Sequence, residues 1–181
     1  MRSRSFANKL FSLALQSSVP VHSSITVSLF CNYKTNIRDY YNSMDLHIGV
    51  TTSTGTIVEF DKNGLRRHRS EQWNQCLLLD QVPSSWTEHW DNTLFQVCKQ
   101  KCWSSKAYSE NRHNCYTFVL TFLMNLNYGN LSKAASNKTA FCEKFIVPRT
   151  TSAGKYISLY RKLKESDFYV HRTPHGAKGA K

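Results

Sequence analysis

The sequence predicts one α+β domain, in which a small antiparallel sheet packs on a central helix that begins at a cysteine. A β-hairpin pattern over residues 46–60 predicts the sheet, and the most apolar segment of the chain, Cys115–Leu126, predicts the central helix. The chain has 181 residues, of which 40% are hydrophobic, so it is long enough and apolar enough to bury a core.

The first half of the chain carries most of the strand patterns. Residues 25–30 form a short run of β-branched and aromatic side chains, which favours a strand. Residues 46–50 and 56–60 read as two hairpin strands joined by a glycine-containing turn, and residues 61–64 form a second turn. A run of three leucines within residues 75–79 predicts another strand, buried on both faces.

Two helices are predicted in the middle of the chain. Ser84 or Ser85 can cap the first, whose apolar residues recur at near-helical spacing. These residues are Trp86, Trp90, Leu94 and Val97. The second helix, Cys115–Leu126, is expected to end near residues 127–129, an Asn-Tyr-Gly sequence that suits a helix C-terminus.

The C-terminal part is predicted to mix loop, strand and helix. Residues 130–139 are polar and predict a loop. Residues 145–147 predict a strand that stops at Pro148. A basic amphipathic helix is predicted over residues 155–165, and a last short strand over residues 168–170.

We expect the domain to span residues 25–170, between a leader of residues 1–24 and a basic, mobile tail of residues 171–181. Residues 1–30 contain three Lys or Arg, many serines and no acidic residue, a composition that resembles a mitochondrial transit peptide. The alternative is an unstructured leader, or one that is a gene-model artefact.

The chain is strongly basic, with 24 Lys and Arg against 12 Asp and Glu and a formal net charge of +12. This charge favours acidic partners, and we expect an acidic protein surface or a phospholipid headgroup. The sequence has no zinc-finger spacing and no RNA-binding signature, so no specific nucleic-acid partner is predicted. No apolar stretch reaches the ~18 residues that a membrane span requires.

Six cysteines are scattered through apolar segments. This pattern is typical of reduced cysteines in an intracellular protein, cytoplasmic or nuclear, rather than of a disulfide-stapled secreted domain. Cys98 and Cys102 lie four residues apart, but no second Cys or His pair supports a metal site. We interpret them as ordinary cysteines on a helix face, and predict no metal and no cofactor.

Cys115 is the candidate nucleophile. It follows a polar loop and opens an apolar helix, where unpaired N–H groups and the helix dipole favour a thiolate. A cysteine nucleophile also needs a base and a site for the oxyanion. His47, at the start of a hairpin strand, is the best base. The backbone N–H of the helix start, with a side-chain donor from Asn114 or His113, can bind the substrate oxygen.

A third residue should orient the imidazole of His47. Glu59, in the second hairpin strand, is the first choice, and Asp61 and Thr56 are weaker ones, because the far end of this strand returns beside His47. A register change of one residue would move Glu59 to the opposite face. The alternative for the whole set is structural, because a cysteine in an apolar helix is usually a small core residue.

The order of a strand histidine before a helix cysteine resembles circularly permuted papain-like thiol hydrolases. The resemblance lies in Asp-Leu-His-Ile-Gly-Val at residues 45–50 and Asn-Cys-Tyr at residues 114–116. The group includes NlpC/P60, lecithin:retinol acyltransferase-like and PPPDE-like enzymes. It implies a permuted papain-like fold, with Cys115 as nucleophile and His47 as base of a hydrolase or acyltransferase on amide, isopeptide or thioester bonds. A catalytically inactive binding or scaffold domain of the same fold is the alternative.

A longer set of blocks resembles the makorin-2 opposite-strand protein family. The blocks lie at residues 45–50, 113–118, 141–150, 155–160 and 168–170. This resemblance implies relatives rather than an activity. Members of the family often carry a zinc-ribbon-like leader with paired cysteines, whereas residues 1–30 of this chain contain no cysteine.

The block at residues 141–150 carries three charged side chains, Glu143, Lys144 and Arg149, on a predicted strand. These side chains can form ion pairs at the strand edge. Arg149 can instead bind an acidic group of a substrate, because a planar guanidinium suits a carboxylate or phosphate.

Overall fold

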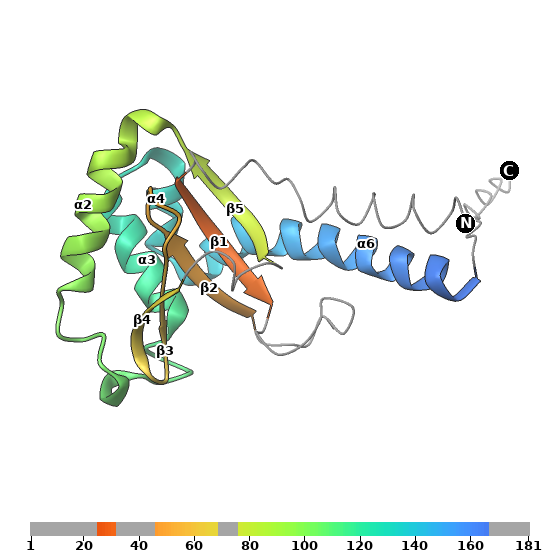
Figure 1. Ribbon diagram of the computed structural model, residues 1–181, viewed down its shortest axis with the longest axis horizontal. Coiled ribbons are helices and arrows are strands. Elements are labelled where there is room, and N and C mark those ends of the chain that lie inside the picture. Colours follow the sequence, from red (N-terminus) through yellow and green to blue (C-terminus); the bar gives the residue numbers. More distant parts are fainter. Residues whose placement is uncertain (1–24, 32–45, 69–75, 167–181) are drawn as a thin grey trace, which may run out of the picture.

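The structure is a computed structural model, and it describes residues 25–31, 46–68 and 76–166. Its centre is an antiparallel sheet of five strands in the order β4-β3-β2-β1-β5 (Figure 1). The strands are β1 (Ile25–Cys31), β2 (Leu46–Thr51), β3 (Ile57–Asp61), β4 (Gly64–His68) and β5 (Cys76–Val82). The α+β class is therefore confirmed, and so is each strand predicted in the first half of the chain. The predicted burial of β5 on both faces is wrong, because Leu79 is buried but Leu77 and Leu78 are only partly buried.

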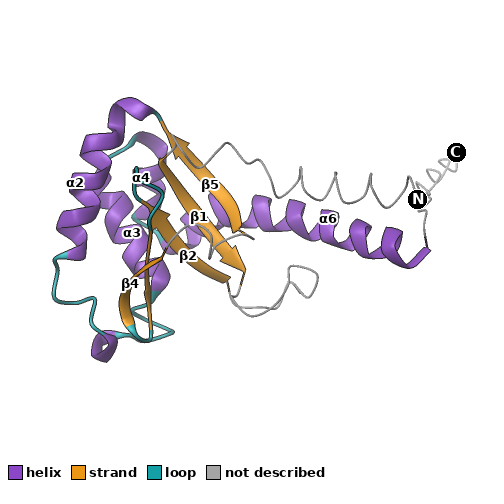
Figure 2. Ribbon diagram, viewed as in Figure 1, coloured by secondary structure: helices purple, strands orange, loops and turns teal. Residues whose placement is uncertain are grey.

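The helices follow the sheet in the sequence. Figure 2 shows the helices in purple and the strands of the sheet in orange. They are α2 (Thr87–Cys98), α3 (Cys115–Leu126), α4 (Gly129–Ala135), α5 (Lys138–Phe141) and α6 (Val147–Ser166). Short 3-10 turns lie at Ser84–Trp86 and Ser105–Ala107, and a π-helical turn at Cys142–Ile146 precedes α6. In the part of the chain that the structure describes, no helix is long and apolar enough to cross a membrane.

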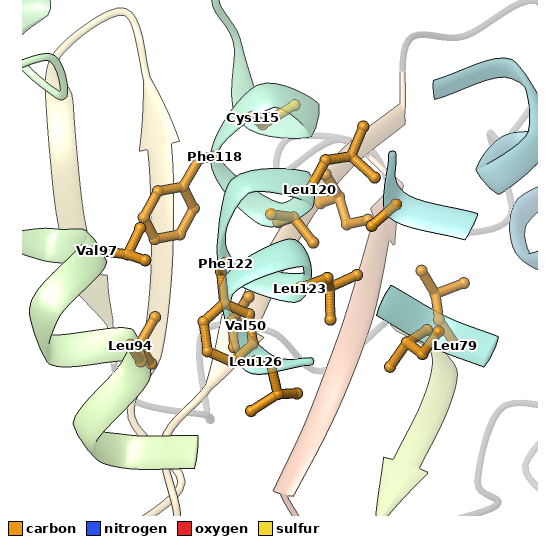
Figure 3. Packing of buried hydrophobic residues seen from close by; sticks show 14 of the residues in the cluster. Val50, Leu79, Leu94, Val97, Cys115, Phe118, Leu120, Phe122, Leu123 and Leu126 are labelled. Carbon is orange, nitrogen blue, oxygen red and sulfur yellow. The ribbon is translucent and has the colours of Figure 1, made fainter. Parts of the chain in front are cut away.

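Helix α3 is the centre of the core, as predicted. It contacts β2 and β3 on one side and α2 and α4 on others. Figure 3 shows Phe118 and Phe122 on the side of α3 that faces Val97 and Leu94 of α2, and Leu123 on the side that faces Leu79 of β5. Its fully buried members are Phe118, Val119, Phe122, Leu123 and Leu126. Burying a side chain of this size contributes about 1.5–3 kcal/mol, so α3 fixes the position of its own first residue, Cys115, against the sheet.

The two ends of α3 have clear local causes. The Asn114 side chain accepts hydrogen bonds from the N–H groups of Tyr116 and Thr117, and the Thr117 hydroxyl accepts from the Asn114 N–H, which completes a capping box. At the other end, Asn127 adopts the left-handed conformation with φ 53°, which stops the helix. The predicted bounds of this helix are therefore confirmed.

The hairpin of β2 and β3 is tied to α2 at its turn. The Trp90 indole N–H donates to the Thr51 carbonyl at 2.8 Å, and the Ser53 N–H donates to Asp91 at 3.0 Å. The Ser53 hydroxyl also donates to the Asp91 carboxylate. Because Trp90 is completely buried, these bonds fix the hairpin relative to the helical layer.

Residues 130–139 are largely helical, and the predicted loop is wrong. They contain most of α4 and the start of α5, capped by Asn137, whose side chain accepts from the Ala140 N–H at 3.1 Å. The cause is packing rather than propensity: Leu131 and Ala135 are buried against the core, and this small apolar face is hidden among polar residues in the sequence.

Residues 145–147 are also helical, and the predicted strand is wrong. The π-helical turn Cys142–Ile146 runs into α6, and Pro148 is the second residue of that helix. A wider i→i+5 turn directly before a proline accommodates both its ring and its missing N–H, so the proline does not end the helix here.

The predicted basic helix of residues 155–165 is part of α6, which extends away from the other described elements in Figure 1. Helix α2 ends at Cys98, and Cys102 lies exposed in the following turn, so the expected pair on one helix face is wrong for Cys102. The predicted strand at 168–170 and the predicted leader and tail lie outside the described residues.

Candidate active site

Cys115 is the first residue of α3, where the cap holds the helix start against the sheet. Figure 3 shows it at the opposite end of the helix from Leu126. Its exposed fraction is only 6%. The first N–H groups of a helix have no partner within the helix, so this position puts the thiol beside backbone donors and the positive end of the helix dipole.

His47 lies near the start of β2, and its side chain is 19% exposed. It forms a side-chain hydrogen bond with Cys115, so a histidine and a cysteine 68 residues apart in the sequence meet in the fold. Its Nε2 lies 2.5 Å from Glu59 Oε2. Strands β2 and β3 pair at Val50 with Val58 and at Thr51 with Ile57, next to their turn, and His47 and Glu59 meet beyond these pairs.

Glu59 is completely buried in β3, and each of its carboxylate oxygens faces an imidazole. Oε2 faces His47, and Oε1 lies 2.5 Å from Nε2 of the buried His68. An ionised carboxylate can only accept hydrogen bonds, so both histidines donate through Nε2–H. The result is a continuous chain of side chains, Cys115–His47–Glu59–His68.

The charge on His47 is set by opposing effects. Burial lowers its pKa, but the hydrogen bonds with Cys115 and Glu59 and the negative charges on both groups outweigh burial and raise the pKa from 6.5 to about 9. His47 is therefore held as an imidazolium at neutral pH, hydrogen-bonded to the cysteine.

The other polar residues predicted near Cys115 have structural partners. Asn114 caps α3 through its oxygen, and its Nδ2 donates to the Glu110 carbonyl at 2.5 Å. His113 stacks on Trp103 with ring centroids 4.9 Å apart and bonds to the Cys102 carbonyl at 3.0 Å. Both residues hold the segment that delivers Cys115 to the helix start.

The weaker alternatives to Glu59 take part in turns. The Asp61 carboxylate accepts from the Asn63 N–H at 2.7 Å and pairs with Arg66 at 3.2 Å. The Thr56 N–H donates to the Thr52 hydroxyl at 3.0 Å. The structure therefore brings Glu59, rather than Asp61 or Thr56, to His47.

Arg149 hydrogen-bonds to two backbone carbonyls. Its Nε donates to the Leu78 carbonyl in β5 at 2.9 Å, and its Nη1 donates to the Phe145 carbonyl at 3.3 Å. It therefore ties the start of α6 to the sheet. The expected ion pairs at a strand edge are wrong, because Glu143, Lys144 and Arg149 all lie on helical turns.

His68 is the one residue of the hydrogen-bonded series Cys115–His47–Glu59–His68 that the sequence did not single out. It lies within a basic run, Arg66-Arg67-His68, which reads as a solvated surface. The available signal was the second turn: pairing across residues 61–64 places residue 68 opposite Ile57, close to Glu59 on the neighbouring strand.

Two other described cysteines, Cys98 and Cys142, are partly buried. Burial raises the pKa of Cys98 and of Cys142, against the smaller opposing effects of Arg67 and Lys138 respectively. Among the residues that the structure describes, no group of three or more His, Cys, Asp or Glu could hold a metal ion.

Comparison with known proteins shows that this chain is similar to one family model and to a human protein. A family model described as DUF4796 C-terminal matches residues 20–163. The chain is 34% identical over 143 residues to a protein from Homo sapiens named MKRN2 opposite strand protein, and the match covers 77% of this chain and 63% of that protein. The chain thus spans less than two thirds of this relative's length. No solved structure matches it.

Proposed function

The chain belongs to the DUF4796 C-terminal family, that of the makorin-2 opposite-strand proteins, and we propose that it is a cysteine-dependent hydrolase or acyltransferase. One observation carries this proposal: Cys115 at a helix start is hydrogen-bonded to His47, which is itself held by the buried Glu59. A nucleophile, a proton carrier and a group that orients the carrier are the parts that acyl transfer needs.

In the first step, the Cys115 sulfur attacks the carbonyl carbon of an amide, isopeptide or thioester. A C–S bond forms, and the proton of the thiol resides on His47. Because Nε2 of His47 donates to Glu59, Nδ1 is the ring atom left to exchange this proton. The N–H groups of Tyr116 and Thr117 donate to the Asn114 cap, so the backbone N–H of Cys115 is the donor at the start of α3 that binds the oxyanion developing on the carbonyl oxygen.

In the second step, the bond to the leaving group breaks, and the imidazolium of His47 donates its proton to that group. Cys115 then carries the acyl group. Water, or the nucleophile of a second substrate, attacks this thioester and gives its proton to His47. The C–S bond breaks, the product leaves, and the proton is shared again by His47 and Cys115.

A permuted papain-like arrangement is part of the proposal. Its support is the order of the parts: a histidine on an antiparallel sheet strand comes first, and a cysteine that opens the central helix comes later. The net charge of +12 supports an acidic protein or phospholipid headgroup as the source of the substrate. The scattered cysteines support an intracellular compartment.

A second candidate function rests on the burial of the cysteine. With 6% of its surface exposed, Cys115 also fits a binding or scaffold domain that kept the fold without catalysis. In that case the hydrogen-bonded chain stabilises the domain, and the thiol does not react.

Competitive alkylation separates the two functions. Iodoacetamide labelling with mass mapping follows Cys115 and Cys102 in the same sample, for wild type, Cys115→Ser and His47→Ala. Exposure alone predicts faster labelling of Cys102, because it is exposed and Cys115 is buried. We expect the opposite order at neutral pH, because the His47 imidazolium and the start of α3 place positive charge beside the Cys115 sulfur, which favours its reaction as a nucleophile.

His89→Ala is the matched control, because His89 lies on α2 and bonds to the Leu126 carbonyl. Loss of the fast labelling in His47→Ala but not in His89→Ala supports the enzyme. Acylation of Cys115 by p-nitrophenyl acetate, detected by intact mass, then shows that it accepts an acyl group. If Cys115 is labelled more slowly than Cys102, and equally in His47→Ala, the domain is a scaffold.

A further inference from the structure

We propose that His68 is a positioning residue of this site, which holds the Glu59 carboxylate in the orientation that lets its other oxygen fix His47. This inference rests on the proposed function, and it adds a residue on a different strand. His68 lies at the end of β4, whereas Glu59 is on β3 and His47 on β2.

The geometry gives the two oxygens of Glu59 separate tasks. Oε2 accepts from His47 and Oε1 accepts from His68, both at 2.5 Å. The carboxylate is completely buried, and a buried carboxylate oxygen that loses its donor is costly. A donor on Oε1 therefore opposes rotation of the carboxyl group, which would take Oε2 away from His47.

The register of the second hairpin places His68 where this bond can form. Strands β3 and β4 pair from Asp61 with Gly64 to Ile57 with His68, so His68 is in the last pair of the ladder. Gly64 fixes the turn, since its φ of 94° and a backbone neighbour, Ser105 N, at 3.1 Å from the position of a Cβ leave no room for a side chain. A slip of one residue would turn His68 to the opposite face.

Two substitutions of His68 separate a hydrogen-bonding role from a packing role. His68→Gln retains an N–H donor at the distance of Nε2, whereas His68→Leu fills the space without one. We expect His68→Leu to slow the alkylation of Cys115 by about tenfold to a hundredfold, the cost of misplacing a group that activates a nucleophile. His68→Gln should remain within about threefold of wild type, because it keeps the donor.

The second readout is the titration of the His47 ring by NMR, which does not require that Cys115 react. It should shift toward that of a free histidine in His68→Leu and stay near wild type in His68→Gln. Arg67→Leu, an exposed neighbour on the same strand, is the control for changes in strand stability. It should change neither readout.

The outcomes keep this inference apart from the proposed function. If alkylation of wild-type Cys115 is fast and requires His47, but His68→Leu changes neither the alkylation rate nor the His47 titration, His68 has no positioning role. If Cys115 is inert in wild type, the proposed function fails, and the His47 titration in the two variants still decides whether His68 holds Glu59. If His68→Leu does not fold, His68→Asn replaces it, because the amide of asparagine stops short of the Nε2 position. Equal His47 titrations in the Asn and Gln variants then overturn the inference.

Discussion

The raised pKa of His47 makes the stability of the domain depend on pH in a defined direction. The pKa is about 9 in the folded chain and 6.5 for a free histidine, so the folded protein binds the proton more tightly than the unfolded chain does. The stabilising contribution is complete below about pH 6.5 and is lost as the pH rises through about 9. At about 1.4 kcal/mol per pH unit, this difference corresponds to about 3 kcal/mol of the free energy of unfolding.

Urea unfolding of wild type and His47→Gln between about pH 6 and about pH 10 measures this contribution. We expect wild type to lose about 3 kcal/mol more than the variant across this range, because the variant has no titrating ring at this position. Cys115→Ser should lose an intermediate amount, since the thiol supplies part of the effect that raises the pKa of His47. Parallel pH profiles for wild type and His47→Gln, or a wild-type stability that rises with pH relative to the variant, would refute this reasoning.

Three further predictions concern other parts of the fold. Asn114→Ala should lower the free energy of unfolding by about 1 kcal/mol in urea melts through loss of the α3 cap, whereas Asn114→Ser should keep most of it. Arg149→Met should cost about 1–3 kcal/mol and speed amide hydrogen exchange at the start of α6, because its two bonds to carbonyls are lost; unchanged exchange would contradict this. At about pH 8, Cys98 and Cys142 should react with iodoacetamide more slowly than Cys102, because burial raises the pKa of both thiols.

The central helix was predictable because its local signals agree with the packing. Asn114, a residue able to cap a helix, comes directly before Cys115. Seven of the twelve residues of the helix Cys115–Leu126 are buried, and Asn127 takes the left-handed conformation that ends the helix. The hairpin that carries His47 was equally clear from its two short strand patterns and the glycine-containing turn between them. Once both elements were known, Cys115 and His47 were the candidates to meet.

The misses have a different cause. Helices α4 and α5 are short and polar, and burial of a few residues such as Leu131 stabilises them, so their local pattern reads as a loop. A proline usually marks the end of a strand or helix, but here Pro148 follows a π-helical turn, which the sequence pattern does not reveal. His68 was missed because its role depends on strand register, which composition does not reveal and which here is set by the Gly64 turn.

The three residues of the imidazole–carboxylate chain come from one short meander, residues 46–68, in which β2, β3 and β4 follow each other directly. Contacts between neighbours in sequence close small loops at low entropic cost, so this part can assemble from local interactions. Cys115 arrives from a distant part of the chain, when α3 docks on the sheet. The thiol is therefore activated only by completed tertiary structure, and a nascent or partly unfolded chain would carry the proton acceptor without a competent nucleophile.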